Sequence, residues 1–200
     1  MNGDKKKEEY TLMPLQDFKA ILCLDDRDDK ISTFCLVSAT HTIEQYCKRR
    51  LLKKKHFEHI EYTGDLLLPL AEYPVQEIIA VFLKIGNSGT GKILEPELYE
   101  IIPDCGTDID LPFNISLSPA LRRYRRLSAI KAVYIAGYEH GKVPPDLASA
   151  CMELAAWNMN RYKGRRIGMT GNTQKDGLHI EMSMPENVKH LLEPYMRKTI

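Results

Sequence analysis

The chain has 200 residues, a length that suits one domain with a possible appendage. Its 28 Lys and Arg nearly balance its 27 Asp and Glu, and a formal net charge of +1 excludes a global field that would attract nucleic acid or a membrane surface. Hydrophobic residues make up 44% of the chain, which is enough for a core, yet no apolar run approaches the roughly 20 residues that a membrane span requires.

The cysteine pattern indicates free thiols. The count of five is odd, and no pair shows Cys-x-x-Cys spacing. We therefore expect reduced thiols in a reducing cytoplasm. These cysteines are Cys23, Cys35, Cys47, Cys105 and Cys151.

The first quarter of the chain predicts a tail and two helices. Residues 1–12 are a charged flexible tail without the apolar core of a secretory signal. Pro14 opens a short helix. A long second helix is expected between the acidic cluster Asp25–Asp29 and the basic end Lys48–Arg50, because carboxylates cap the first amides of a helix and cations favour its C-terminal end.

The middle of the chain predicts strands. A Gly-rich connection, Gly86–Lys92, separates the apolar run Ile78–Leu83 from a second apolar run, Leu98–Ile102. This pattern is typical of a β-hairpin in which the two runs pair. The long irregular stretch 103–124 contains one more short strand around Ile115. Loops of this length in a compact domain often make contacts.

The stretch from residue 130 to 161 predicts a strand, a tight turn and a helix. Ile130–Tyr138 is rich in β-branched and aromatic residues, as buried strands are. Gly137 marks the turn, and Pro144 prevents a helix from starting before Asp146. The helix that follows carries one apolar stripe and includes Trp157. This arrangement supplies a scaffold and no catalytic chemistry.

The C-terminal region, residues 164–200, predicts a Gly-rich linker followed by a docking helix. Pro185 starts the short helix and Pro194 stops it. The sequence thus divides into the tail 1–12, a helical domain with a β insertion at 13–163, and this final segment.

One stretch resembles a phosphate-binding P-loop. Gly86–Lys92 matches the first seven positions of that motif, but Ile93 occupies the eighth and has no hydroxyl for magnesium. The loop should also lead into a helix, which Pro96 opposes. We therefore interpret it as a hairpin tip, and keep a nucleotide-dependent enzyme as a rival hypothesis.

Metal sites and a nucleophilic centre are also disfavoured. Asp25–Asp29 lacks the alternating oxygens, central glycine and final glutamate of a calcium loop. His56 and His59 would point to opposite faces of a strand. Cys151 lies on an apolar helix stripe and fits a buried structural thiol. We expect no catalytic residue, no cofactor and no metal.

Two basic clusters stand out. The first is formed by Arg122, Arg123, Arg125 and Arg126, and the second by Lys163, Arg165 and Arg166. Such clusters bind phosphate backbones or pair with carboxylates across a protein interface. The near-zero net charge favours the interface, and a small nucleic-acid-binding module remains the alternative.

The order of several motifs resembles the adaptor family of phage head–tail connector, or head-completion, proteins. Each motif is weak, but together they cover nearly all of the chain after its tail. They are Ile43 to Leu51, Leu67-Leu68-Pro69, Tyr73-Pro74-Val75, Ala136-Gly137-Tyr138, Val143-Pro144-Pro145-Asp146-Leu147, Trp157 with Arg161, and Pro185 to Tyr195.

The resemblance implies a mainly α fold (α+β): a bundle of three to four helices with a small antiparallel β-hairpin. It implies a dodecameric ring of a virion at the head–tail interface, assembled in the host cytoplasm. The ring would lie under the portal protein, extend the channel for double-stranded DNA without sequence recognition, and dock a stopper or tail-completion protein. No membrane contact is expected.

Two residue sets follow from this interpretation. Those expected to contact the portal, a neighbouring subunit or the DNA lumen are Arg122, Arg123, Arg125, Arg126, Arg165, Arg166, Leu191, Leu192 and Tyr195. Those expected to maintain the subunit fold are Gly137, Tyr138, Pro144, Asp146 and Trp157.

Overall fold

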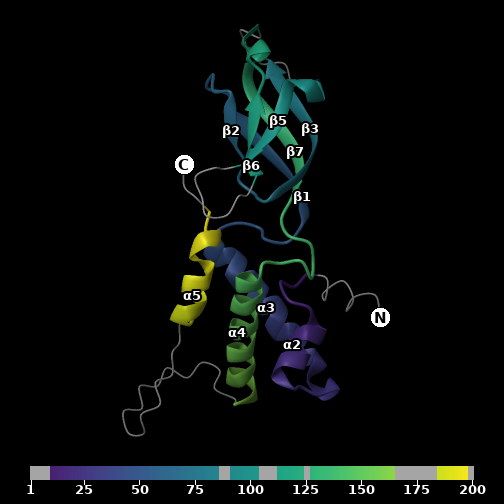
Figure 1. Cartoon of the computed structure of the whole chain (residues 1–200), viewed down its shortest axis with the longest axis vertical. Coiled ribbons are helices and arrows are strands. Elements are labelled where there is room, and N and C mark those ends of the chain that lie inside the picture. Colours follow the sequence, from purple (N-terminus) through teal and green to yellow (C-terminus); the bar gives the residue numbers. More distant parts are fainter. Residues whose placement is uncertain (1–9, 86–90, 104–111, 124–126, 165–183, 198–200) are drawn as a thin grey trace. The chain divides into compact units, whose positions relative to one another are not determined.

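The computed structural model describes residues 10–85, 91–103, 112–123, 127–164 and 184–197 (Figure 1). It divides into two compact units. The helical unit consists of Met1–Lys48 and Glu139–Ile200, and the strand unit is the intervening Arg49–Tyr138. The strand unit lies inside the range 13–163, where a β insertion into a helical domain was expected, and the boundaries expected at residues 12 and 163 stay a prediction.

Helices of the helical unit pack side by side. α3 packs against α4, while α2 contacts α3 and α5 contacts α4 (Figure 1). The helices are α2 (Leu15–Leu22), α3 (Asp29–Cys47), α4 (Pro145–Lys163) and α5 (Glu186–Leu192), with short 3-10 helices η1 (Asp26–Asp28) and η4 (Glu193–Tyr195). Pro14, Pro144 and Pro185 each precede a helix in extended backbone, close to the predicted helix starts, and α4 begins at Pro145, one residue before the predicted Asp146.

Apolar stripes at helical spacing form the interior of this unit. On α3, Cys35, Ala39 and Ile43 are fully buried, as are Leu147 and Cys151 on α4. A repeat of three or four residues places such side chains on one face of a helix, so that the two faces meet. The long helices were predictable for this reason.

The acidic cluster before α3 does not cap it as predicted. The N-cap residue Asp28 makes no side-chain hydrogen bond to the first amides of α3. Instead Nζ of Lys19, on α2, lies 2.5 Å from a carboxylate oxygen of both Asp26 and Asp29, and Asp28 pairs with Lys163 at 2.9 Å. The carboxylates thus connect the start of α3 to α2 and α4, a use that local sequence does not reveal.

Two antiparallel sheets form the strand unit. One has the order β1-β7-β3-β4 and the other β2-β6-β5. The strands are β1 (Lys54–Glu61), β2 (Leu67–Pro69), β3 (Val75–Ile85), β4 (Lys92–Ile93), β5 (Tyr99–Pro103), β6 (Pro112–Leu117) and β7 (Leu127–Ala136), and 3-10 helices η2 (Pro96–Leu98) and η3 (Pro119–Arg123) precede β5 and follow β6.

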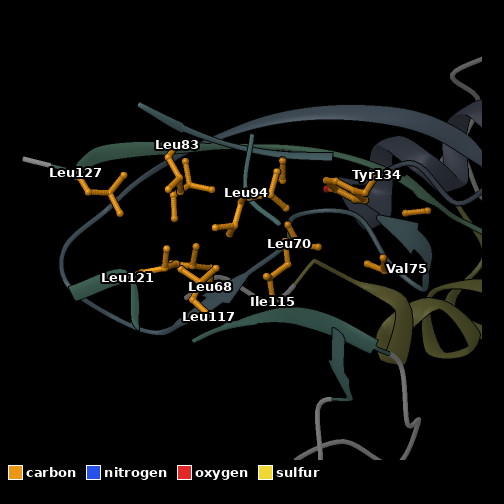
Figure 2. Close-up of a cluster of buried hydrophobic side chains, with 14 residues drawn as sticks. Leu68, Leu70, Val75, Leu83, Leu94, Ile115, Leu117, Leu121, Leu127 and Tyr134 are labelled. Atoms are coloured by element: carbon orange, nitrogen blue, oxygen red, sulfur yellow. The ribbon is translucent and has the colours of Figure 1, made fainter. Parts of the chain in front are cut away.

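The two sheets share one hydrophobic core (Figure 2). Side chains of β7 and β3, such as Tyr134 and Leu83, meet those of β2 and β6, such as Leu68 and Ile115. Burial of apolar surface, at about 25 cal/mol per Å², is what stabilises this pair of sheets. The strand unit therefore contains a core of its own.

This architecture corrects the expected fold class. The fold is mixed α+β, with more β structure than a mainly α bundle with a small hairpin. The expected pairing of residues 78–83 with 98–102 is also wrong. β3 pairs with β7 and β4, whereas β5 pairs with β6 in the other sheet. β7 was expected as a strand, but its position between β1 and β3 depends on pairing between distant segments.

Candidate interaction surfaces

Gly137 lies where the backbone after β7 meets the backbone before β1. Its φ is +102°, and a Cβ there would lie 2.6 Å from the carbonyl carbon and oxygen of Leu52. The next residue, Tyr138, donates its N–H to Leu51 O at 2.7 Å and accepts from Lys53 N at 2.8 Å. Only glycine combines this φ with so close an approach. The Ala-Gly-Tyr motif is therefore a backbone junction.

The C-terminal helix packs into its own chain. Leu192 and Tyr195 are buried in the helical unit, while Leu191 is half-buried. The Tyr195 hydroxyl donates to the Asp146 carboxylate, with both carboxylate oxygens 2.6 Å away. Arg197 N also donates to Cys47 O at 2.8 Å. A partner could reach Leu192 and Tyr195 only if α5 left α4.

Three of the residues expected to maintain the subunit fold belong to the region of α4. Two of them lie at its start and one lies within it. Pro144 is its N-cap and Asp146 stands in its first turn, where its carboxylate accepts from Leu147 N at 3.0 Å. Trp157 is half-buried, with the Arg161 guanidinium 4.6 Å from its ring centroid. Asp146 thus connects the start of α4 to the C-terminal segment.

Most of the basic clusters lie beyond the described residues. Arg125, Arg126, Arg165 and Arg166 fall in undescribed segments, and for Arg122 and Arg123 only the backbone of η3 is described. Lys163, at the end of α4, forms the ion pair with Asp28. Contact of the arginines with a portal, neighbour or DNA stays a prediction.

The structure also places the residues considered for metal or nucleotide chemistry. His56 and His59 do point to opposite faces of β1: His56 stacks on Tyr134 with centroids 5.6 Å apart, and His59 is exposed. Lys92 opens strand β4 and no helix, unlike a P-loop lysine. Within the described ranges, no group of three or more His, Cys, Asp or Glu could hold a metal ion.

Cys151 is fully buried in α4, and burial raises the pKa of its thiol to about 12. Its sulfur lies 3.8 Å from the Thr40 hydroxyl. A thiol in this state is a poor nucleophile, which agrees with the structural role expected for it. Among the helices that the structure describes, none is both long and apolar enough to cross a membrane.

Sequence reasoning missed the outer face of the four-stranded sheet. The inner face carries the core residues Ile130, Ala132 and Tyr134 of β7, so the alternate residues face outward. On edge strand β1 the exposed residues also alternate. This outer face includes Lys55, Phe57, His59 and Glu61 of β1, Ala129 and Lys131 of β7, Phe82 and Lys84 of β3, and Ile93 of β4.

A hollow of about 320 Å³ opens on this outer face. The described residues that line it are His59, Phe82, Lys84, Gly91, Ala129, Ile130 and Lys131. The alternation Lys55, Phe57, His59 was visible in the sequence. The proximity of these residues to Lys84 and Lys131 could not be predicted from the sequence, because it depends on the order of the strands in the sheet.

The fold defined by these two units is similar to that of chains in two solved neck structures. No family model and no curated protein sequence matches the chain. Among solved structures, a chain from the "Neck of empty GTA particle computed with C6 symmetry" (GTA, gene transfer agent) superposes with a TM-score of 0.60 and 17% identity, over 94% of this chain and 91% of that one.

A second solved structure gives the same result. A chain from the "Neck of native GTA particle computed with C12 symmetry" superposes with a TM-score of 0.58 and 18% identity, over 94% of this chain and 90% of the other. At this identity the likeness establishes a common fold. That fold includes both the helical and the strand unit, since the superposition spans nearly all of both chains.

Proposed function

We propose that the protein is a structural subunit of a head–tail junction, forming a ring beneath the portal of a phage-like particle. The observation that carries this proposal is the likeness, over 94% of the chain, to subunits of two neck structures. Those necks were computed with C6 and C12 symmetry, which fits a subunit that assembles by rotation. Ring contacts of this kind join two different faces of the subunit and must close.

In this proposal the ring is dodecameric, extends the DNA channel and presents a docking surface for a stopper or tail-completion protein. Its location is the virion, and DNA passes through its lumen without sequence recognition. The expected arginine contacts belong to this proposal. So does the absence of chemical turnover: ATP hydrolysis by the purified protein that disappears in Lys92→Ala would contradict the proposed role.

Electron microscopy of the protein mixed with its portal tests the proposal. We expect class averages in which an added ring lies coaxial with the portal. The matched control is the portal alone under the same conditions. The proposal fails if no density is added, or if particles that lack this protein attach their tails normally.

A further inference from the structure

We propose that the hollow on the outer face of the four-stranded sheet binds a phosphate group, supplied by the backbone of double-stranded DNA. Three nitrogen-bearing side chains line it, from His59 on β1, Lys131 on β7 and Lys84 on β3. None of its described lining residues is a carboxylate. This set suits an anion, and lysine ammonium groups are common ligands of phosphate.

The strand register brings these three side chains together. His59 is directly opposite Lys131 across the β1–β7 pair. Lys131 is opposite Phe82, and Lys84 is opposite Ala129, two residues along β7 on the same face. Directly opposite side chains in an antiparallel pair have Cβ atoms about 5 Å apart, and diagonal neighbours about 7–8 Å. One phosphate can therefore contact more than one of the three.

The floor of the hollow is apolar and narrow. Ala129, Ile130 and Phe82 contribute to it, and a Cβ on Gly91 would lie 3.1 Å from the Phe82 Cβ. Cations beside an apolar floor keep fewer waters between themselves and a bound anion, so their attraction to it is less screened than on an open surface. A side chain at residue 91 would therefore press against Phe82, which lines the hollow.

A chain of phosphates fits the outer face better than a single free one. Past the hollow the outer face carries Lys55, which with Lys131 flanks the Phe57 ring at 5.3 and 5.7 Å from its centroid, and also the exposed Glu77, which like Lys55 is opposite Ile135. Lys55 and His59 are four residues apart on β1, which separates them by about 13 Å along the strand. Nitrogen-bearing side chains spread over this length can contact successive backbone phosphates, whereas a small anion would use only the hollow.

The choice of DNA as the phosphate source rests on the proposed function, in which DNA passes through the neck. The phosphate site itself stands on the hollow alone. The test therefore uses the isolated full-length protein, so that its failure is distinguishable from failure to form a ring. A protein without this site could still assemble on a portal.

The experiment measures binding of a fluorescent 30-base-pair duplex by anisotropy, from about 50 to 200 mM salt. We expect the double variant Lys84→Gln/Lys131→Gln to bind more weakly and to flatten the slope of log K against log salt by about 1.8, the value for two lost phosphate contacts. Glu61→Gln, which removes a carboxylate on the same face opposite Ala129, should strengthen binding.

The matched control is Lys30→Gln/Lys142→Gln, which removes the same charge from exposed lysines of the helical unit. It should keep the wild-type slope. Lys30, Lys84 and Lys142 are exposed and Lys131 is half-buried, and thermal unfolding of each variant verifies that it is folded. An unchanged affinity and slope for the Lys84/Lys131 variant would overturn the proposal.

Two competitors distinguish the sources. Wild-type protein could bind ATP but no duplex, with ATP binding lost in the Lys84/Lys131 variant. That result would support the phosphate site and assign it to a free phosphate. The second competitor is polyglutamate, compared with unlabelled DNA at equal total charge. If polyglutamate displaces the labelled duplex as effectively as DNA does, the proposal is overturned in favour of an acidic protein partner. Wild-type protein that binds neither duplex nor ATP would also overturn it.

Discussion

Gly137 is the residue where backbone geometry limits substitution most directly. Its positive φ alone costs a residue with a side chain roughly 1–3 kcal/mol. The approach of a Cβ to within 2.6 Å of Leu52 adds a clash with backbone that cannot rotate away. We expect Gly137→Ala to lower the free energy of unfolding by at least about 2 kcal/mol, as measured by urea denaturation.

Gly64 provides the control for this prediction. Its φ is +106°, close to that of Gly137, but a Cβ added at Gly64 would meet nothing within 4 Å. Gly64→Ala thus carries the backbone strain without the clash. Equal losses in the two variants would contradict the role of close packing at Gly137.

We expect the reactivity of each cysteine thiol to depend on its burial. Cys23 is exposed, whereas Cys35, Cys47 and Cys151 are buried. Burial raises the pKa of Cys35 to about 11, so that only roughly one thiol in a thousand would ionise at pH 8. With Cys105 changed to Ser, we expect an aromatic disulfide reagent to label Cys23 rapidly and the buried thiols only after denaturation.

Replacing Cys23 by Ser in the same background should remove the rapid phase. A rapid phase that persists in this variant would show that a buried helix face opens on the timescale of the reagent. The labelling rate thus reports the integrity of the α3–α4 contact.

His56 should make the stability of the strand unit depend on pH. Burial lowers the pKa of His56 below its ordinary 6.5, with Lys54 and Arg50 acting in the same direction and Glu58 opposing them. The unfolded chain then binds the proton more readily than the folded chain. The free energy of unfolding should therefore fall as pH falls from about 6.5 towards the lowered pKa.

The measurement is urea denaturation at a series of pH values between 5 and 7.5 (roughly the range in which histidine titrates). His56→Phe keeps a ring against Tyr134 and should lose part of this dependence. His59→Gln, on the exposed face of the same strand, serves as control. A pH profile unchanged by His56→Phe would refute the assignment.

At the scale of elements, α5 depends on its contacts with α4. Its Val188 and Leu192 are fully buried, and Asn187 donates a hydrogen bond to Glu153 of α4. The Tyr195 hydroxyl, which follows in η4, donates to the charged Asp146. Hydrogen bonds to charged groups contribute about 1.5–3 kcal/mol each. We expect Tyr195→Phe to reduce stability by that amount.

Hydrogen exchange of the α5 amides measures this effect locally, since opening of α5 can precede global unfolding. Tyr162→Phe, which keeps its ring contact with Phe34, is the matched control and should leave the exchange of α5 unchanged. Unchanged protection of α5 in Tyr195→Phe would show that apolar burial alone holds the helix.

At the scale of the whole molecule, the strand unit is an insertion between two pieces of the helical unit. Each unit has its own buried core, and the chain passes between them near residues 48 and 138. A subunit with this organisation offers separate surfaces on two bodies. In the proposed ring, each contact would join two different faces of the subunit, and both units have surfaces that could supply them.

From the proposed function we expect twelve copies in the portal-bound ring. Native mass spectrometry of the cross-linked ring, with the monomer at 22.9 kDa as the unit of mass, counts them. The cross-linked portal alone is the control. A closed ring of any other number would contradict the expectation while leaving the neck assignment intact.

The sequence by itself determined the features that depend on nearby residues. Pro14, Pro144 and Pro185 mark helix starts because the proline ring restricts the local backbone, and the stripes of α3 and α4 follow from helical periodicity. β7 was recognisable from its β-branched and aromatic residues. A turn at Gly137 was predicted, but the close approach of its backbone to Leu52 was not.

Only the tertiary structure decided the features that depend on distant residues. These features include the position of β7 between β1 and β3 and the ion pairs of Lys19 with Asp26 and Asp29. They also include the hydrogen bond from Tyr195 to Asp146. The same holds for the hollow lined by His59, Lys84 and Lys131. Propensity and periodicity act over a few residues, whereas strand order and ion pairing are selected by the free energy of the whole packed chain.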